Sequence, residues 1–351
     1  MSSTPTTFVI GAGAGVPYGY PTGAELTRIV MGDVRAFDWQ GAPVDERIVR
    51  AKAAAAGRLE GAVKEARYVE TNRQLPVLEA LRRALRYATP LSIDALLMQR
   101  QEFVEVGKQA IAAALLPFEV NKDWSLFPYS GDWIGHLVRA MYGDGEGAPE
   151  EAVRIVTFNY DRLLEHRLTL ALSALRGVSV VEAWEAVQKI PMIHVYGSLG
   201  EYVPEPVYGK VDWGGSASAA VNAERVNLAA QSIRLIHERG GDDALTPEVE
   251  TARGFISDSQ RVWFLGFGYD ATNVERLAVR SDNGFSVIGT AYGMTEAEMI
   301  IAKSAVRSSL RVKSGTLLNG RPTYEPISYS AIELVDGDCL RAFREHANRL
   351  H

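Results

Sequence analysis

The chain has a single cysteine, Cys339, among its 351 residues. One cysteine excludes an internal disulfide and any zinc site built from several cysteines. Long apolar runs are also lacking, because a stretch such as Ala110–Leu116 is far shorter than the roughly 20 residues that span a bilayer. The first residues lack the basic region and the apolar region of a secretory signal. We therefore expect a cytoplasmic protein that does not insert into membranes.

Positive charge is not in excess, since 37 lysine and arginine residues stand against 43 aspartate and glutamate residues, for a net charge of −6. This balance argues against a nucleic-acid surface over the whole chain, so we expect no direct nucleic-acid binding. A hydrophobic content of 47% and a charged content of 23% are those of an ordinary globular protein. The length is enough for one large domain or two smaller ones.

The start of the chain is rich in glycine. The apolar residues Phe8–Ile10 lead into several glycines, and a helix-like segment, Ala24–Val30, follows. The order of strand, glycine turn and helix can leave backbone N–H groups free to hold a phosphate. The usual dinucleotide fingerprint is broken, because Gly11 and Gly13 fit it but Val16 stands in place of the third glycine. Two interpretations stay open: a phosphate-binding loop of another pattern, or a glycine turn with a purely structural role.

Six short apolar segments, rich in β-branched residues, are typical of buried strands. Helix-like segments or long insertions separate them, which is the alternation of a parallel sheet covered by helices on both faces. We therefore predict an α/β fold with a Rossmann-like, mostly parallel sheet. The predicted strands are Thr7–Ile10, Val153–Phe158, Met192–Tyr196, Val262–Gly266, Ser286–Ile288 and, with a weaker pattern, Tyr329–Leu334.

The long interval between the first two predicted strands contains no clear strand of its own. It is rich in Ala, Leu, Glu, Arg and Lys, which favour helix. We predict that residues 41–149 form a helical subdomain inserted into a Rossmann-like domain of residues 1–40 and 150–351. A second insertion, Tyr202–Gly241, should contain the helix Ala217–Arg239. The other predicted helices are Val44–Ala66, Leu75–Tyr87, Ile93–Leu116 and Trp133–Met141.

Polar residues and glycines follow several predicted strands, at the edge where a parallel sheet binds its ligand. Asn159 and Asp161 come after the second strand, although either could instead cap the helix that follows. His194 and Tyr196 are two apart on the third strand, so we expect both side chains on one face of it. A lone strand histidine is, however, more often a satisfied core residue than a catalyst. Further strand ends contribute Gly197 with Ser198, Gly266 and Gly268 with Asp270, and the glycine-bearing segment Gly289–Gly293.

In order and spacing, these motifs resemble those of the sirtuins. The segment Gly11–Pro21 matches the spacing of the signature G-A-G-x-S-x-x-x-G-x-P, and Thr157–Leu163 is similar to the N-x-D element. Tyr196–Leu199 occupies the place of the family's H-G-S-L. Leu265–Asp270 and Leu91–Leu96 resemble elements of the sirtuin-like NAD⁺ hydrolases of bacterial anti-phage defence. The agreement extends from residue 6 to about residue 340.

Three departures from the sirtuin pattern bear on the reaction. Deacylases carry an Asp-Phe-Arg tripeptide where this chain has Thr22–Ala24, and one cysteine cannot build their four-cysteine zinc module. Tyr196 stands in place of the family's histidine, and a tyrosine with an ordinary pKa near 10 is a poor base for deacylation. His194 could take over that role, or Tyr196 could serve only as a hydrogen-bond partner of the ribose. Together these departures disfavour a deacylase far more than an NAD⁺ hydrolase.

The resemblance implies NAD⁺ as the substrate and no metal ion. Asn159 would orient the ribose or the attacking water, Asp161 would hold the nicotinamide amide, and His194 would be the candidate base. The glycine loop at the start would cradle the pyrophosphate, and the later glycines would approach the adenosine half. The residues implied to contact NAD⁺ are Gly11, Ala12, Gly13, Gly15, Pro21, Tyr196, Gly197, Ser198, Gly266, Gly268 and Asp270.

By resemblance, we expect an NAD⁺ hydrolase that cleaves the nicotinamide–ribose bond as an abortive-infection effector. The chain shows no sensor domain of its own, which suggests activation by assembly into a homo-oligomer or by an associated ATPase or Argonaute-type protein. The alternative is a non-catalytic module that binds NAD or ADP-ribose and scaffolds a defence complex. Tyr196 in place of histidine is the best support for that alternative.

Overall fold

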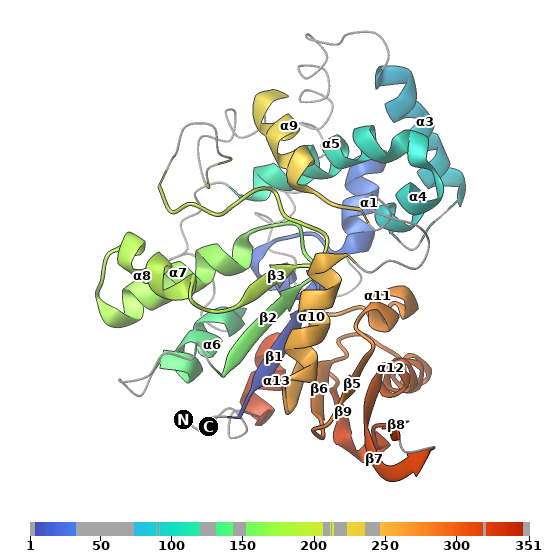
Figure 1. The fold of residues 1–351 in the computed structure, drawn as a ribbon. Helices are drawn as coiled ribbons and strands as arrows, with labels where there is room; N and C mark the ends of the chain where they lie inside the picture. Colours follow the sequence, from blue (N-terminus) through green and yellow to red (C-terminus); the bar gives the residue numbers. More distant parts are fainter. Residues whose placement is uncertain are drawn as a thin grey trace.

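The computed structural model describes residues 4–32, 74–88, 90, 92–119, 131–142, 152–205, 211, 213, 223–235, 246–318 and 321–346. They build an α/β fold around a sheet of six parallel strands in the order β3-β2-β1-β4-β6-β9 (Figure 1). The strands are β1 (Thr6–Ile10), β2 (Val153–Thr157), β3 (Met192–His194), β4 (Arg261–Leu265), β6 (Ser286–Thr290) and β9 (Ile332–Val335). The predicted α/β fold with a Rossmann-like parallel sheet is confirmed.

The two central strands, β1 and β4, owe their apolar sequences to burial on both faces. Every residue of β1 is buried, and Phe8 packs with its ring centroid 5.9 Å from that of Trp263 on β4. Phe343, on helix α13 (Cys339–His346), stacks on Trp263 at 5.2 Å. Large side chains of this kind each remove substantial apolar area from water, and they fix the sheet in the centre of the core.

Helices cover both faces of the sheet. Helix α10 (Pro247–Ser257) contacts β2 and β3 on the face nearer the viewer in Figure 1. On the other face, α6 (Trp133–Tyr142) packs against α13 and against α7 (Leu163–Arg176). The residues of α6 fall within the range 41–149 assigned to the insertion, yet they pack beside the sheet. The remaining helices of the sheet region are α8 (Val180–Val187), α11 (Ala271–Arg276) and α12 (Glu296–Ser309).

A helical region lies beyond the carboxyl ends of the strands (Figure 1). It contains α1 (Gly23–Met31), α3 (Gln74–Ala88), α4 (Ile93–Gln99), α5 (Val104–Leu115) and α9 (Ala223–Ser232). Helix α9, from the second insertion, packs against α5, from the first, and Gln109 donates to the Asn227 side chain at 3.2 Å. The two insertions therefore share one helical region.

Two predicted helices differ from those observed. Ile93–Leu116 is divided by the short 3-10 turn Gln101–Phe103, which folds α4 back so that Leu97 packs on Gly107, where a Cβ atom would lie 2.6 Å from the Leu97 methyl groups. The described part of Ala217–Arg239 ends as a helix at Ser232, because the next residue, Ile233, forms a β-bridge with Gly197. The predicted helix Val44–Ala66 lies outside the described residues.

The small mixed sheet β5-β7-β8 was not predicted. Its strands are β5 (Val279–Ser281), β7 (Leu310–Leu318) and β8 (Arg321–Pro326), with β5 parallel and β8 antiparallel to β7. The predicted strand Tyr329–Leu334 begins only at Ile332, because Ser328 caps a 3-10 turn over Tyr329–Ala331. No helix in the described part of the chain is long and apolar enough to cross a membrane.

Candidate functional site

The order of the strands marks where a ligand would bind. Successive strands run outward in one direction from β1 through β2 to β3, and in the other from β4 through β6 to β9. Ile10 of β1 pairs in register with Thr157 of β2 and with Leu265 of β4, so the three strands end level with one another. In such sheets, ligands bind outside the carboxyl ends of the strands, at the point where the order reverses. We call this edge, between β1 and β4 and extending to β3, the switch-point edge.

Two glycine loops meet at the switch-point edge. The Gly13 amide donates to the Gly266 carbonyl at 2.9 Å, and the Gly11 amide donates to the Leu265 carbonyl at the same distance. A Cβ atom on Gly266, whose φ is +58°, would lie 1.9 Å from the Ala14 amide nitrogen. Packing between the two loops therefore accounts for these glycines, and the amides of Gly11 and Gly13 are engaged within the protein rather than free for a phosphate.

The other residues predicted to contact NAD⁺ have varied surroundings. Gly15 packs against Tyr20, and Gly197, with φ of +68°, lies against the backbone of Ser232. Asp270 caps α11 by accepting from the amides of Thr272 and Asn273 at 3.0 and 3.2 Å. A Cβ atom on Gly268 would meet nothing within 4 Å, so this glycine borders open space. Of the rest, Ala12 and Ser198 are partly buried and Pro21 is buried.

Asn159 lies directly beyond β2 at the switch-point edge. Its side-chain amide donates to the Gly11 carbonyl at 3.3 Å, which connects the β2 loop to the β1 loop. Its Oδ1 atom is buried and has no hydrogen-bond partner among the described residues. Buried polar atoms in proteins are almost always satisfied, so an unpaired oxygen here points to a missing donor such as a ligand hydroxyl or a water.

Asp161 follows two residues later and accepts from the Leu163 amide at 3.2 Å, at the start of α7. Burial, reinforced by the negative charge of Glu119, raises the pKa of this carboxyl to about 7. An acid with a pKa near neutrality can both give and accept a proton under physiological conditions, which is the property expected of a catalytic carboxyl.

His194 is held by two protein groups. Its Nδ1 lies 2.8 Å from the Asn159 carbonyl oxygen, and its Nε2 lies 2.8 Å from Oε1 of Glu165 in the first turn of α7. Burial opposes the charged imidazolium, but the Glu165 carboxylate and the Asn159 carbonyl outweigh it and raise the pKa of His194. Both ring nitrogens are therefore engaged as donors, and the imidazole positions the Asn159 loop against α7.

Tyr196 does not share a strand face with His194. The predicted strand Met192–Tyr196 ends at His194, and Tyr196 lies in the following turn. The Tyr196 hydroxyl donates to the Asn273 side chain and accepts from Arg276, both on α11. Burial raises the pKa of Tyr196 although Arg276 opposes the shift, so the phenol stays protonated. The expectation that both side chains lie on one face of the strand is therefore wrong, because the strand ends two residues early.

The chain matches no known protein family and no curated protein. The described residues form an α/β fold with a six-stranded parallel sheet. Among the described residues, no group of three or more His, Cys, Asp or Glu side chains is placed to hold a metal ion.

A buried ion pair between Arg162 and Glu119 supports the Asn159–Asp161 loop. Arg162 is fully buried, and its Nε lies 3.1 Å from Oε2 of Glu119, while its backbone amide donates to Oε1 of Glu119 at 2.8 Å. Arg162 also donates to the carbonyls of Glu201 and Val211. This residue thus fastens the start of α7 to the helical region and to the segment after β3.

Sequence reasoning missed Glu119, Glu165 and Arg276. Glu165 carried one usable signal, since it lies four residues after Asp161, in the first turn of α7. Its Oε2 atom is buried without a partner in the described part of the chain, as is the Asn159 oxygen. Glu119 and Arg276 reach the site from distant segments, and no local pattern marks them.

Proposed function

We propose that this protein is an NAD⁺ hydrolase whose reaction takes place at the switch-point edge. Two neighbouring features of one loop carry the proposal: the buried Asn159 oxygen has no hydrogen-bond partner among the described residues, and the pKa of the Asp161 carboxyl is about 7. Both groups lie where a doubly wound parallel sheet binds its ligand. The resemblance of Gly11–Pro21, Thr157–Leu163 and Leu265–Asp270 to sirtuin-like NAD⁺ hydrolases supports the choice of substrate.

In this reaction the bond between the ribose C1′ and the nicotinamide nitrogen breaks, and its electron pair leaves with nicotinamide. The oxygen of a water molecule bonds to C1′, giving ADP-ribose and releasing one proton. The unpaired oxygen of Asn159 is suited to accept a hydrogen bond from the ribose or from that water. Asp161, when ionised, is suited to receive the proton. The transition state resembles an oxocarbenium ion, so positioning and charge provide most of the catalysis.

A specific observation favours a second candidate, a non-catalytic module that binds NAD or ADP-ribose. Both ring nitrogens of His194 and the hydroxyl of Tyr196 are occupied by protein partners. In this case the edge would bind the dinucleotide without cleaving it, and the chain would serve as a scaffold.

The deciding experiment measures nicotinamide and ADP-ribose by chromatography after incubation of the purified protein with NAD⁺. Because activation by self-assembly is part of the hypothesis, the assay is run on size-separated oligomer and monomer fractions. Equimolar nicotinamide and ADP-ribose support the hydrolase. Tight binding of NAD⁺ without either product supports the binding module, and neither binding nor turnover in any fraction contradicts both. An associated ATPase or Argonaute-type protein as the trigger remains a hypothesis.

A further inference from the structure

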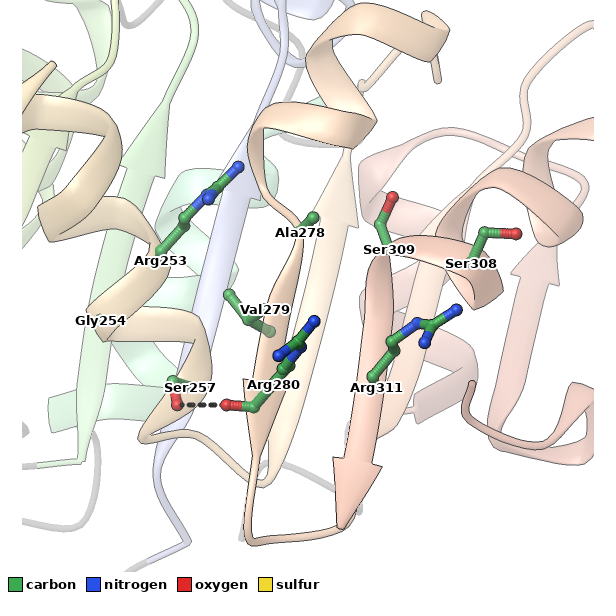
Figure 2. Close-up of a pocket in the computed structure, with 9 residues that line it drawn as sticks. All are labelled: Arg253, Gly254, Ser257, Ala278, Val279, Arg280, Ser308, Ser309 and Arg311. Carbon is green, nitrogen blue, oxygen red and sulfur yellow. Dashed lines mark hydrogen bonds between the residues drawn. The ribbon is translucent and has the colours of Figure 1, made fainter. Parts of the chain in front are cut away.

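A pocket lies away from the switch-point edge, on the side of the molecule that carries the small mixed sheet. It has a volume of about 610 Å³ and lies between α10, β5, the end of α12 and the start of β7 (Figure 2). Three arginines line it, each from a different element: Arg253 on α10, Arg280 on β5 and Arg311 on β7. None of the residues assigned to the switch-point edge contributes to it.

Contacts with the protein hold these arginines in place. Arg253 donates to the backbone carbonyls of Arg276 and Glu275 at 2.7 and 3.3 Å. Arg280 lies with its guanidinium carbon 5.8 Å from the centroid of the Tyr324 ring, and Arg311 donates to the Tyr324 carbonyl at 3.5 Å. Tyr324 thus supports two of the three side chains, which lowers the ordering cost of binding an anion.

The positive charge in the pocket is not neutralised by the described residues. None of the three arginines forms a salt bridge with a described carboxylate, although Glu250 and Glu275 act on Arg253 from a greater distance. On the small sheet, Asp282 is already paired with Lys313 at 3.1 Å. Arg253 is partly buried, so water solvates its guanidinium only in part, and this loss of solvation lowers the pKa of Arg253.

The size and lining of the pocket indicate the class of ligand. A volume of about 610 Å³ falls within the range of small-molecule sites. A guanidinium group can donate two parallel hydrogen bonds to phosphate oxygens, and the Ser309 hydroxyl adds a polar group beside the apolar wall of Val279. The Ser257 hydroxyl donates to the Arg280 carbonyl at 3.3 Å (Figure 2). One phosphate monoester carries a charge of about −2 at neutral pH, which is less than three arginines supply. We propose that this pocket binds a small molecule that carries two or more phosphate groups.

Calorimetric titration with inorganic pyrophosphate tests the proposal on the full-length protein. We expect wild type to bind pyrophosphate about tenfold more tightly than orthophosphate, because each additional charge-assisted contact adds affinity. The double variant Arg280→Gln/Arg311→Gln should bind pyrophosphate at least about tenfold more weakly than wild type. If the double variant fails to fold, as judged by a thermal melt, the single variant Arg311→Gln replaces it.

Two controls locate the binding. Arg321→Gln removes an exposed arginine from β8 of the same small sheet, outside the pocket, and should leave affinity unchanged. Arg344→Gln removes an exposed arginine from α13, which does not line the pocket, and should also leave pyrophosphate affinity unchanged. Absence of binding, equal affinity for orthophosphate and pyrophosphate, or equal affinity in wild type and the double variant overturns the proposal. Tighter binding of a single-stranded oligonucleotide that depends on Arg280 and Arg311 would assign the surface to nucleic acid and also overturn it.

Discussion

The Nδ1 atom of His194 lies 2.8 Å from the backbone carbonyl oxygen of Asn159, while the other ring nitrogen lies 2.8 Å from Glu165. The imidazole thereby connects the end of β3, the loop after β2 and the first turn of α7. The side chain is about 14% exposed, and that of Glu165 about 9%, so solvent weakens neither contact much. In this arrangement His194 helps to position Asn159, together with Thr157 and Gly11, and the Asn159 side-chain oxygen stays without a partner among the described residues.

Replacement of Asn159 by alanine should abolish most NAD⁺ turnover while leaving the fold intact. Loss of one positioning or stabilising group of this kind typically lowers the rate by about 10²- to 10³-fold. The measurement is nicotinamide release, with thermal melting as the check on folding. Asn283→Ala, which changes an exposed asparagine in the loop before β6, is the matched control and should retain full activity. Turnover by Asn159→Ala at the wild-type rate would show that the site is assigned to the wrong strand end.

The raised pKa of Asp161 predicts a specific dependence of stability on pH. Between its ordinary value of 3.8 and its folded value of about 7, the folded protein binds more protons at this group than the unfolded chain does. The stability contributed by protonated Asp161 is therefore largest at low pH and is lost as the pH rises through about 7. The pKa of His194 is raised as well, and its contribution is lost in the same direction.

Asp161→Asn removes the contribution of Asp161, because the amide does not titrate. Relative to wild type, this variant should gain on the order of 2 kcal/mol of unfolding free energy between about pH 5 and about pH 8. Urea denaturation at both pH values measures the difference, and Asp270→Asn, at the cap of α11, serves as the control carboxyl. An Asp161→Asn variant whose stability follows the wild-type pH curve would mean that the carboxyl is not buried as described.

The contact between the two glycine loops predicts opposite outcomes at neighbouring positions. Gly266→Ala places a Cβ atom 1.9 Å from the Ala14 amide nitrogen, at a residue whose φ is +58°. This variant should lose about 1–3 kcal/mol of stability, the typical cost of a strained backbone conformation. Gly268→Ala meets nothing within 4 Å and should change stability by no more than about 0.5 kcal/mol. Similar melting temperatures for the two variants would contradict the loop packing.

The buried pair of Arg162 and Glu119 should be costly to break on one side only. Glu119→Leu leaves a fully buried guanidinium without its carboxylate, and a loss of about 3–5 kcal/mol is expected. The double variant Glu119→Leu/Arg162→Met should lose clearly less than the sum of the two single losses, since no charge is then left unpaired. Chemical denaturation of the four proteins in this cycle measures the coupling. Additive losses would show that the two side chains do not act as a pair.

The main sheet could be predicted because its strands are short, nearly continuous apolar segments, a pattern typical of buried parallel strands. Phe8–Ile10 and Trp263–Leu265 are buried on both faces, so their sequences contain almost nothing polar. The small sheet gave no such signal, because β7 carries Arg311 and Lys313 on an exposed surface. Its strands are stabilised by pairing with each other rather than by a continuous apolar pattern.

The candidate site could be predicted only in part. Asn159 and Asp161 directly follow a predicted strand, and the carboxyl ends of parallel strands share one edge of the sheet. Their position at that edge could therefore be predicted from their place in the sequence. Their partners depend on tertiary packing: Glu119 follows α5, Asn273 and Arg276 lie on α11, and each approaches from a different side. The side of the strand on which Tyr196 lies was predicted wrongly for another reason. Side chains alternate between the two faces only while the strand continues, and this strand ends before Tyr196. The arginine pocket left no local pattern, because its three arginines come from separate elements.

The final prediction separates the roles of His194 and Tyr196. His194→Ala removes the link between the Asn159 carbonyl and the Glu165 carboxylate, leaving both without their partner. If Asn159 is the residue that positions the ribose or the water, its displacement should lower NAD⁺ turnover by about 10²-fold or more, with KM changing less than kcat. His194→Gln restores a donor to one partner and should recover part of that loss.

Tyr196→Phe removes only a hydroxyl from Asn273 and Arg276, so it should cost on the order of 1–2 kcal/mol of stability and affect turnover less. Turnover and thermal melts of the three variants decide the matter. A fall in turnover that is larger for Tyr196→Phe than for His194→Ala would assign the catalytic role to the tyrosine hydroxyl and would remove His194 from the site.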